Sequence, residues 1–260
     1  MASLQRLVMN QKLRTLLLLV TCFFLFTAAS HSFKTEQQKY PRVKTAYTEK
    51  EALITRQLAS KGIHIKEPVQ LYLRAFKEEA IIELWAKNST AKTFQLVDTF
   101  EICSMSGTIG PKRKQGDRQV PEGFYHIDRF NPASSFYLSL GINYPNTSDK
   151  IIGGNNNPGG DIFIHGACVS IGCMALTDEP IKALYIYCVE AYNGGQAKIP
   201  VTIFPARLTS ANFNRLIKQV PAQTELWTEM KSAYTFFNAN KKLPGISFLE
   251  NGRHKVSEQK

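Results

Sequence analysis

The sequence has few cysteines, no repeats and no long apolar run, the features that mark disulfide-rich, repeat and membrane-spanning proteins. Five cysteines among 260 residues are too few for a disulfide scaffold. The chain has no internal repeat and no long low-complexity segment, which excludes a repeat architecture. Its longest apolar run, Leu16 to Phe26, is shorter than the about 20 residues that a transmembrane helix needs. The length is enough for one substantial domain with additions, or for two small ones.

The first 30 residues have the order of a secretory signal peptide. Basic Arg6, Lys12 and Arg14 precede the apolar run, and the small residues of positions 27 to 30 follow it. We therefore expect an exported chain that is cleaved near residue 30. A link to the membrane is expected only through this segment, where it stays uncleaved.

The charge of the remaining chain is strongly positive. Without the first 30 residues it keeps 29 basic against 21 acidic residues, a net of +8. Such a charge favours anionic surroundings, including cell-wall polymers and membrane surfaces. A nucleic acid would be an unusual target for an exported protein, so we expect no nucleic-acid partner.

The hydrophobic pattern predicts a core of strands between helices. Thr48 and Glu51 match a capping box, which predicts a helix over 48–61 that ends at Gly62. From Val69 to Ile102 the period changes to two, which indicates a β meander. Further strands are expected over 124–127, 161–165 and 199–204, and helices over 178–192 and in two segments after residue 210. The glycine- and asparagine-rich segment 142–160 is expected to be a loop, either a lid beside the substrate or a solvated connection.

Residues that can carry chemistry are concentrated between positions 164 and 178. His165 ends a predicted strand, and Cys168 and Cys173 follow in a short loop. A thiol needs a nearby base or cation to become an effective nucleophile, and histidine can supply either. Gly172 favours Cys173 over Cys168, because a glycine before the nucleophile lets backbone amides converge on a developing oxyanion. Cys168 is then a bystander or a redox partner.

A third group should orient the imidazole of His165. Asp161 lies four residues upstream, about 13 Å away along an extended strand, which is too far for contact. Asp178 is expected to cap the following helix. A backbone carbonyl is therefore the expected partner, and His165 and Cys173 form a dyad.

Other interpretations of the same residues stay open. His165, Cys168 and Cys173 could be unrelated core residues or ligands of a metal, although their spacing has no second matching ligand pair. We therefore expect no metal and no cofactor. Cys188 belongs to an apolar helical stripe and is expected to be a buried thiol. Cys103 is either a core residue or half of a disulfide.

The segment that contains His165 and Cys173 resembles the L,D-transpeptidase catalytic domain (YkuD) family, in its YafK-like branch. The resemblance rests on Ile164-His165-Gly166 followed by Ser170-Ile171-Gly172-Cys173. It extends over roughly 66–205, through residues 110–112, 116–125, 131–132, 137–139 and 144–146. Each motif alone is weak, and the set is specific to the family.

The resemblance implies a mostly β (α+β) fold with a β-sandwich catalytic domain over 66–205. An N-terminal helical segment over 31–65 would precede it, and a C-terminal helical extension with a polar tail over 206–260 would follow. The implied activity is that of a cysteine acyltransferase or amide hydrolase acting on peptidoglycan stem peptides, in the periplasm or cell wall.

In the chemistry that the resemblance implies, Cys173 attacks a diaminopimelate carbonyl and forms a thioester, with His165 as the base. Gly166, Ser170 and Gly172 would support the site, and the amides of Gly172 and Cys173 would hold the oxyanion. An amine would resolve the thioester in a transpeptidase and water in a hydrolase. Some members hydrolyse the bond between peptidoglycan and a wall-linked lipoprotein. The alternative is a non-catalytic peptidoglycan-binding module with the same cleft.

The sequence departs from the commoner family pattern around the cysteine. His165 and Cys173 are only eight residues apart, and Met174-Ala175 stands where many members have an arginine that helps to bind a substrate carboxylate. We expect Lys112, Arg118 and Tyr144 to contact substrate, while the basic run over 112–118 could equally be a solvated loop. Arg113, Lys114 and Arg129 are further candidates to replace that arginine.

Overall fold

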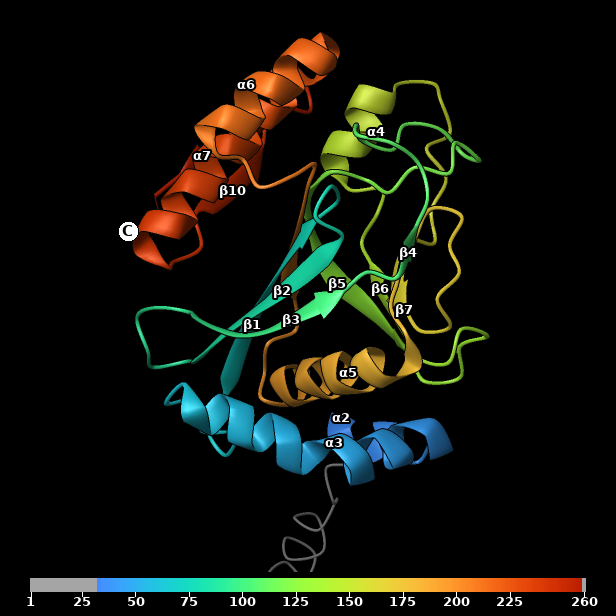
Figure 1. The fold of residues 1–260 in the computed structure, drawn as a ribbon, viewed down its shortest axis with the longest axis vertical. Helices are drawn as coiled ribbons and strands as arrows, with labels where there is room; N and C mark the ends of the chain where they lie inside the picture. The colour runs from blue at the N-terminus through green and yellow to red at the C-terminus, as the bar shows by residue number, and fades with distance from the viewer. Residues whose placement is uncertain (1–31, 259–260) are drawn as a thin grey trace, which may run out of the picture. The chain divides into compact units, whose positions relative to one another are not determined.

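A computed structural model describes residues 32–258 of the chain. The predicted signal peptide and Cys22 lie outside these residues. The described strands form one curled nine-stranded sheet and a separate two-stranded hairpin, with helices at both ends of the chain (Figure 1), so the mixed α+β fold is confirmed. No helix of the described part is long and apolar enough to cross a membrane.

The large sheet has the strand order β3-β2-β1-β9-β5-β6-β7-β8-β4. Its bounds are β1 Val69–Phe76, β2 Ile81–Asn88, β3 Gln95–Glu101, β4 Ser104–Met105, β5 Gly123–Asn131, β6 Ser139–Ile142, β7 Phe163–His165, β8 Met174–Ala175 and β9 Ile199–Phe204. The predicted meander is the antiparallel β1-β2-β3 unit. β9 joins it in parallel to β1, and β8 pairs in parallel with β7.

The N-terminal helices pack on the main core. α5 (Asp178–Asn193) is buried along most of its length, and α3 (Pro41–Ser60) lies against it on the side away from the sheet, next to α2 (Phe33–Gln37) (Figure 1). The prediction that α3 begins at Thr48 is wrong, because this helix begins at Pro41. Pro41 stands in the first turn, where proline is well tolerated, and the Thr48 hydroxyl donates to the carbonyl of Lys44 inside the helix.

The segment predicted to be a loop over 142–160 contains a short helix. α4 (Thr147–Gly153) begins at a capping box in which Asn146 and Asp149 exchange hydrogen bonds. Asp149 is buried, and its carboxylate also accepts from the Tyr125 hydroxyl and the Arg113 guanidinium. The segment therefore contains regular structure and is not the continuous loop that was predicted.

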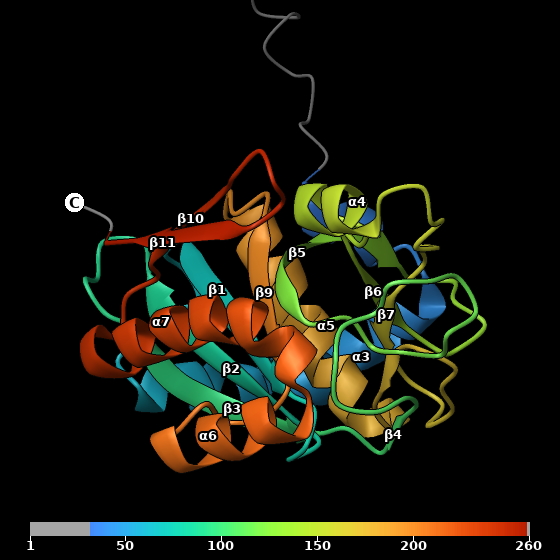
Figure 2. The ribbon, with the colours of Figure 1, turned by 90° about the horizontal axis from the view of Figure 1, so that it is seen from above.

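The C-terminal segment makes a second, smaller core. It consists of α6 (Ser210–Gln219), the 3-10 turn η1 (Pro221–Gln223), α7 (Thr224–Asn240) and the hairpin of β10 (Gly245–Phe248) and β11 (His254–Ser257). The two helices were predicted, whereas the hairpin lies in the segment predicted to be a polar tail. α7 packs on the β1 and β9 part of the sheet (Figure 2), where Trp227 contacts the same cluster as Phe76 and Phe204. Trp227 Nε1 donates to the buried carboxylate of Glu122 at 2.7 Å, which ties the helix to the start of β5.

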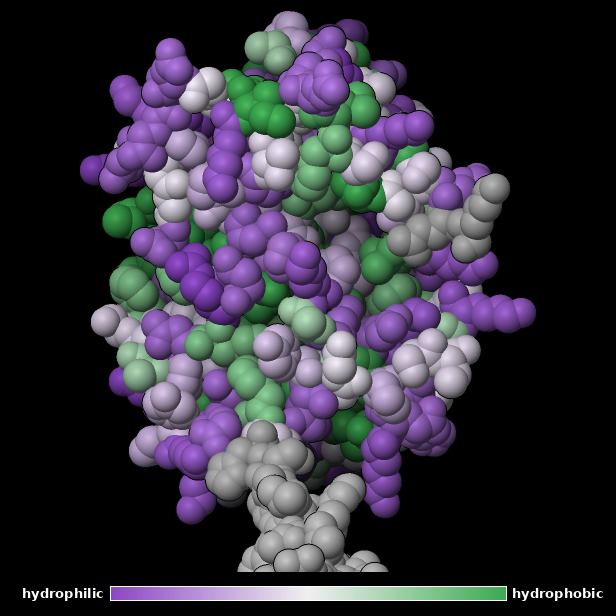
Figure 3. Space-filling model, turned by 180° about the vertical axis from the view of Figure 1, so that it is seen from behind, coloured by the Kyte–Doolittle hydropathy of each residue, from purple (hydrophilic) through white to green (hydrophobic). Residues whose placement is uncertain are grey.

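Most of the face seen in Figure 3 is hydrophilic, with small apolar areas between the polar side chains. This agrees with a basic chain in which the apolar side chains are gathered in the cores.

Candidate active site

Two short parallel strands bring His165 and Cys173 to the same pocket. His165 is the last residue of β7 and pairs with Ala175 of β8, while Ser139 of β6 pairs with it on the other side. Cys173 comes immediately before β8 and two residues before Ala175, so its side chain lies on the same face of the sheet as that of His165. Both residues line a pocket of about 470 Å³.

The imidazole of His165 is held in one orientation by its own loop. Its Nδ1 lies 2.7 Å from the carbonyl oxygen of Gly166. Because a carbonyl only accepts, Nδ1 carries the proton of the neutral ring, and Nε2 keeps its lone pair. The backbone carbonyl expected from the sequence is therefore present. Burial lowers the pKa of His165, so the ring is neutral at neutral pH, and the Phe136 ring packs against it with centroids 4.7 Å apart.

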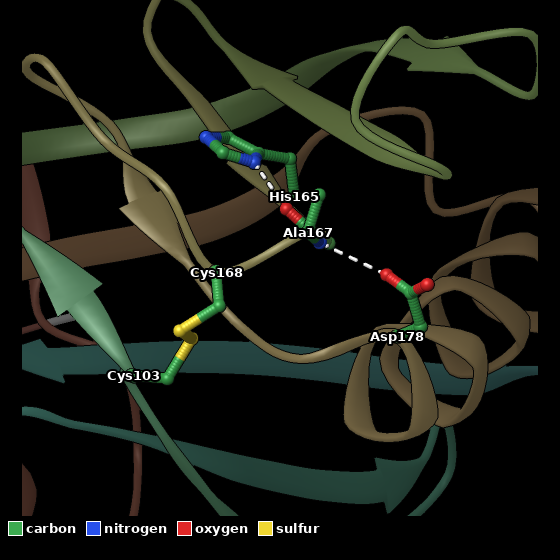
Figure 4. Close-up of a disulfide and its surroundings, with 6 residues drawn as sticks. Cys103, His165, Ala167, Cys168 and Asp178 are labelled. Atoms are coloured by element: carbon green, nitrogen blue, oxygen red, sulfur yellow. Dashed lines mark hydrogen bonds between the residues drawn. A yellow bond between two sulfur atoms is a disulfide. The ribbon is translucent and has the colours of Figure 1, made fainter.

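Asp178 supports the loop rather than the histidine (Figure 4). It is the first residue of α5, and its carboxylate accepts from the amide of Ala167 at 2.9 Å. Asp178 was expected to cap α5, but among the described residues no side chain forms a capping hydrogen bond at the start of this helix. A Cβ on Gly166 would lie 2.6 Å from the same carboxylate oxygen, so only glycine fits beside Asp178.

The thiol of Cys173 is a protonated donor in this structure. Its Sγ donates to the carbonyl oxygen of Asp161 at 3.7 Å, and burial raises its pKa above that of an ordinary cysteine. No hydrogen bond within the described residues joins Sγ to the imidazole. Hydrogen bonds of this kind often form only when substrate is bound. With a raised thiol pKa and a lowered imidazole pKa, the pair is neutral rather than a preformed ion pair.

The Ser170 hydroxyl accepts hydrogen bonds from the two amides that were expected to hold an oxyanion. Its Oγ accepts from Gly172 N at 3.2 Å and Cys173 N at 2.9 Å, and it donates to the carbonyl of Cys173 at 2.7 Å. Gly172 has φ of +137°, which an L side chain rarely adopts, so the sharp turn expected from this glycine is present. The amides of Gly172 and Cys173 thus converge on one acceptor, the Ser170 hydroxyl.

A disulfide between Cys103 and Cys168 ties this loop to the end of β3 (Figure 4). It settles the two alternatives left open for Cys103, and it removes the proposed metal ligand set, because a disulfide sulfur is not a thiolate. The described residues hold no cluster of three metal-ligating side chains. Ala167 and Cys168 both have left-handed φ values, 65° and 44°. Cys188 is the expected buried thiol, and burial raises its pKa.

Comparison with known proteins places these features in one family. The L,D-transpeptidase catalytic domain (YkuD) profile matches residues 72–203, just over half of the chain. The chain belongs to the L,D-transpeptidase catalytic domain (YkuD) family.

A relative from Escherichia coli agrees with this assignment. The "Putative L,D-transpeptidase YafK" of Escherichia coli (strain K12) is 37% identical over 190 residues, which cover 72% of this chain and 74% of that protein. Among solved structures, the helical cell shape determining protein Pgp2 from Campylobacter jejuni is 18% identical with a TM-score of 0.43, over 70% of this chain and 73% of that chain. Bd1075 of Bdellovibrio bacteriovorus is 18% identical with a TM-score of 0.38, over 70% and 77%.

Two of the three side chains expected to bind the family's substrate are buried in other contacts. Lys112 is 5% exposed, and its Nζ donates to Asp117 at 2.6 Å. Its charge still lowers the pKa of Cys173, against the larger effect of burial. Tyr144 is 4% exposed and donates from its hydroxyl to backbone carbonyls, so it braces the loops instead of facing the pocket that contains Cys173. Arg118 is exposed, and its backbone passes close to Gly172.

The pocket has an apolar rim that sequence reasoning missed. Phe136, Val169 and Ile171 line it, and Ile171 is 81% exposed. Exposed apolar side chains of this size at the rim of a pocket point to contact with a ligand. The alternation of Val169 and Ile171 with small residues was visible in the sequence, but nothing in it showed which way they face.

Arg129 lies against Asp161 and Phe163, two residues that line the pocket. Arg129 Nη1 donates to Asp161 Oδ1 at 2.8 Å, and its guanidinium stacks over the Phe163 ring at 4.9 Å. Asp161 has a left-handed φ of 55° and an exposed carboxylate. Five basic residues were considered as substitutes for the missing arginine. Among them, Arg129 contacts two residues that line this pocket, Asp161 through a hydrogen bond and Phe163 through its ring.

Proposed function

We propose that this protein is an exported, cysteine-dependent enzyme that modifies peptidoglycan stem peptides. Cys173 attacks the carbonyl of a diaminopimelate residue, and a thioester links that residue to the enzyme. The observation that carries the proposal is the shared pocket of His165 and Cys173, in which the Gly166 carbonyl fixes the ring so that Nε2 is available as a base. Membership of the L,D-transpeptidase family supports the substrate class.

The proposed acylation begins from a neutral pair. Nε2 of His165 takes the proton of the Cys173 thiol as Sγ bonds to the carbonyl carbon. When the amide C–N bond breaks, the imidazolium returns that proton to the leaving amine. The lowered pKa of His165 makes its imidazolium a strong acid for this second transfer. An amine or water then attacks the thioester carbonyl and releases Cys173, with the same ring as the base.

The developing oxyanion is stabilised at the amides of Gly172 and Cys173. These amides now donate to Ser170 Oγ, so we infer that the oxyanion displaces this hydroxyl when the carbonyl becomes tetrahedral. The hydroxyl holds the amides in a converging arrangement before substrate arrives, which avoids reorganisation during the reaction. Gly166 supports the site by leaving room for the Asp178 carboxylate.

The other parts of the chain fit an exported wall enzyme. The proposed catalytic domain covers 66–205, and the described residues of the flanking segments 31–65 and 206–260 pack on it. The net charge of +8 beyond residue 30 favours an anionic wall. We place the protein in the periplasm or cell wall, with stem peptides as substrate and a wall-linked lipoprotein as a further partner.

The test is an assay of the purified protein, from residue 31 onward, on defined muropeptides with and without an added amine acceptor. Mass spectrometry of the products separates the two outcomes: a new cross-link identifies a transpeptidase, and free acid alone identifies a hydrolase. Cys173→Ala must abolish both. Binding of muropeptides without turnover by the intact protein would instead identify a non-catalytic binding module.

A further inference from the structure

A second and larger hollow adjoins the pocket of His165 and Cys173. Its volume is about 980 Å³, compared with about 470 Å³ for the pocket around the thiol, and both are in the range of ligand sites. Asp161 lines both spaces, so it stands where the two meet. A ligand that reaches Cys173 from this side passes Asp161.

The far wall of the hollow comes from the C-terminal segment. Leu243, Pro244, Ile246 and Phe248 line it, opposite β5 and the start of α4. This wall lies outside the residues 72–203 that match the family. It is firmly attached, because Glu229 of α7 accepts from the side chains of Arg253 and His254, and His254 is buried between the rings of Phe124 and Phe248.

The charged side chains of the hollow leave two lysines without a partner. Three cations, Arg129, Lys150 and Lys198, face the carboxylates of Asp128 and Asp161, a net of +1. Arg129 donates to both carboxylates. Neither Lys150 nor Lys198 forms an ion pair with a described residue, so their ammonium groups are free to pair with a ligand.

Together, these contacts describe a ligand of modest negative charge. A net of +1 is too small to hold a polyanion, while two unpaired ammonium groups suit one or two carboxylates. The aromatic and aliphatic lining, from Phe124 and Tyr125 to Ile246 and Phe248, suits the rest of a short peptide.

We propose that the hollow is a second peptide-binding compartment, which takes the carboxylate-bearing arm of the substrate through Lys150 and Lys198. The inference rests on the proposed function for the identity of the peptide. The C-terminal hairpin is then part of the substrate site, and the chain beyond the family domain contributes to the choice of substrate. The peptide passes Asp161 on its way to the thiol.

The test measures binding without turnover. In the Cys173→Ala background, isothermal titration gives the Kd for a soluble tetrapeptide stem and for the same peptide with its carboxylates amidated. Lys150→Glu with Lys198→Glu brings the charge of the hollow to −3, and we expect the Kd for the free carboxylate peptide to rise tenfold or more. The Kd for the amidated peptide should change far less.

The control variant carries Lys61→Glu with Lys92→Glu, which makes the same change of net charge at two exposed lysines that do not line the hollow. Its Kd should stay that of the parent protein. A second variant, Ile246→Trp, fills the hollow from the hairpin side and should weaken binding of both peptides. Thermal melting verifies that each variant is folded.

Three results would overturn the proposal: an unchanged Kd in the Lys150→Glu, Lys198→Glu protein, an equal loss in the control variant, or no binding of the stem peptide by the Cys173→Ala protein. Failure of the proposed chemistry has a different signature. In that case the wild-type protein forms no thioester, while the Cys173→Ala protein still binds the peptide and still responds to the lysine variants.

Discussion

Reduction of the disulfide between Cys103 and Cys168 should destabilise the whole domain. The cross-link joins residues 65 positions apart. In the chain-entropy treatment, releasing a loop of this length costs about 4 kcal/mol of stability at 25 °C. For a domain of this size each kcal/mol shifts Tm by a few degrees, so Tm should fall by roughly 10 °C. Thermal unfolding followed by circular dichroism, with and without a thiol reductant, measures this shift.

The same bond should matter more to activity than to stability, because it lies beside the reactive loop. Ala167 and Cys168 hold left-handed backbone conformations that the bond and the Asp178 contact maintain. Below its Tm the reduced protein should therefore lose most of its turnover while it remains folded. A Cys103→Ser, Cys168→Ser variant serves as the control, since it should match the reduced protein and not respond to reductant. An unchanged Tm on reduction of the wild-type protein would refute this reasoning.

Further predictions concern the reactive pair and the fold. Burial raises the pKa of Cys173, so the rate of alkylation of the thiol should keep rising above pH 9. Burial lowers the pKa of His165, so the midpoint of the acid limb of kcat/KM should lie below pH 6.5. An alkylation rate that reaches a plateau at neutral pH would argue for an ion pair. Gly172→Ala should cost about 1–3 kcal/mol, measured by urea denaturation, because its φ of +137° is strained for alanine although a Cβ would make only ordinary contacts, the nearest 3.5 Å from the Gln119 carbonyl oxygen; an unaffected Cm would contradict this. Glu122→Ala should cost about 3–5 kcal/mol, because it leaves the buried ammonium of Lys77 without its carboxylate; calorimetry that finds a small loss would show that the three carbonyls around Lys77 suffice.

Alternating and helical periods were enough to predict most of the sheet and the late helices, because they depend on which face of each element is buried. Start signals were less reliable. Thr48 with Glu51 was predicted to be a cap and is not one, whereas the cap of Asn146 and Asp149 lies in a segment predicted to be a loop. The difference lies in tertiary packing. Val43 and Ala46 are buried against the core, so α3 extends back to Pro41.

The shared pocket of His165 and Cys173 was predictable, because a strand that ends in histidine and a glycine turn before cysteine restrict the backbone together. The positions of the side chains expected to contact substrate were not predictable. Lys112 and Tyr144 were expected at the pocket for their charge and ring, but their burial depends on Asp117 and on the loops that close over them. The pairing of Cys103 with Cys168 likewise depends on two segments that meet only in the folded chain.

The most direct test of the proposed chemistry is the intact mass of the protein during reaction with a stem peptide. A rapidly acid-quenched sample should gain the mass of the acyl part of the peptide, and proteolysis should locate the adduct on Cys173 as a thioester that hydroxylamine removes. Cys173→Ala should gain no mass and release no product. Product formation by Cys173→Ala, or an adduct on a residue other than Cys173, would contradict the proposed role of this thiol.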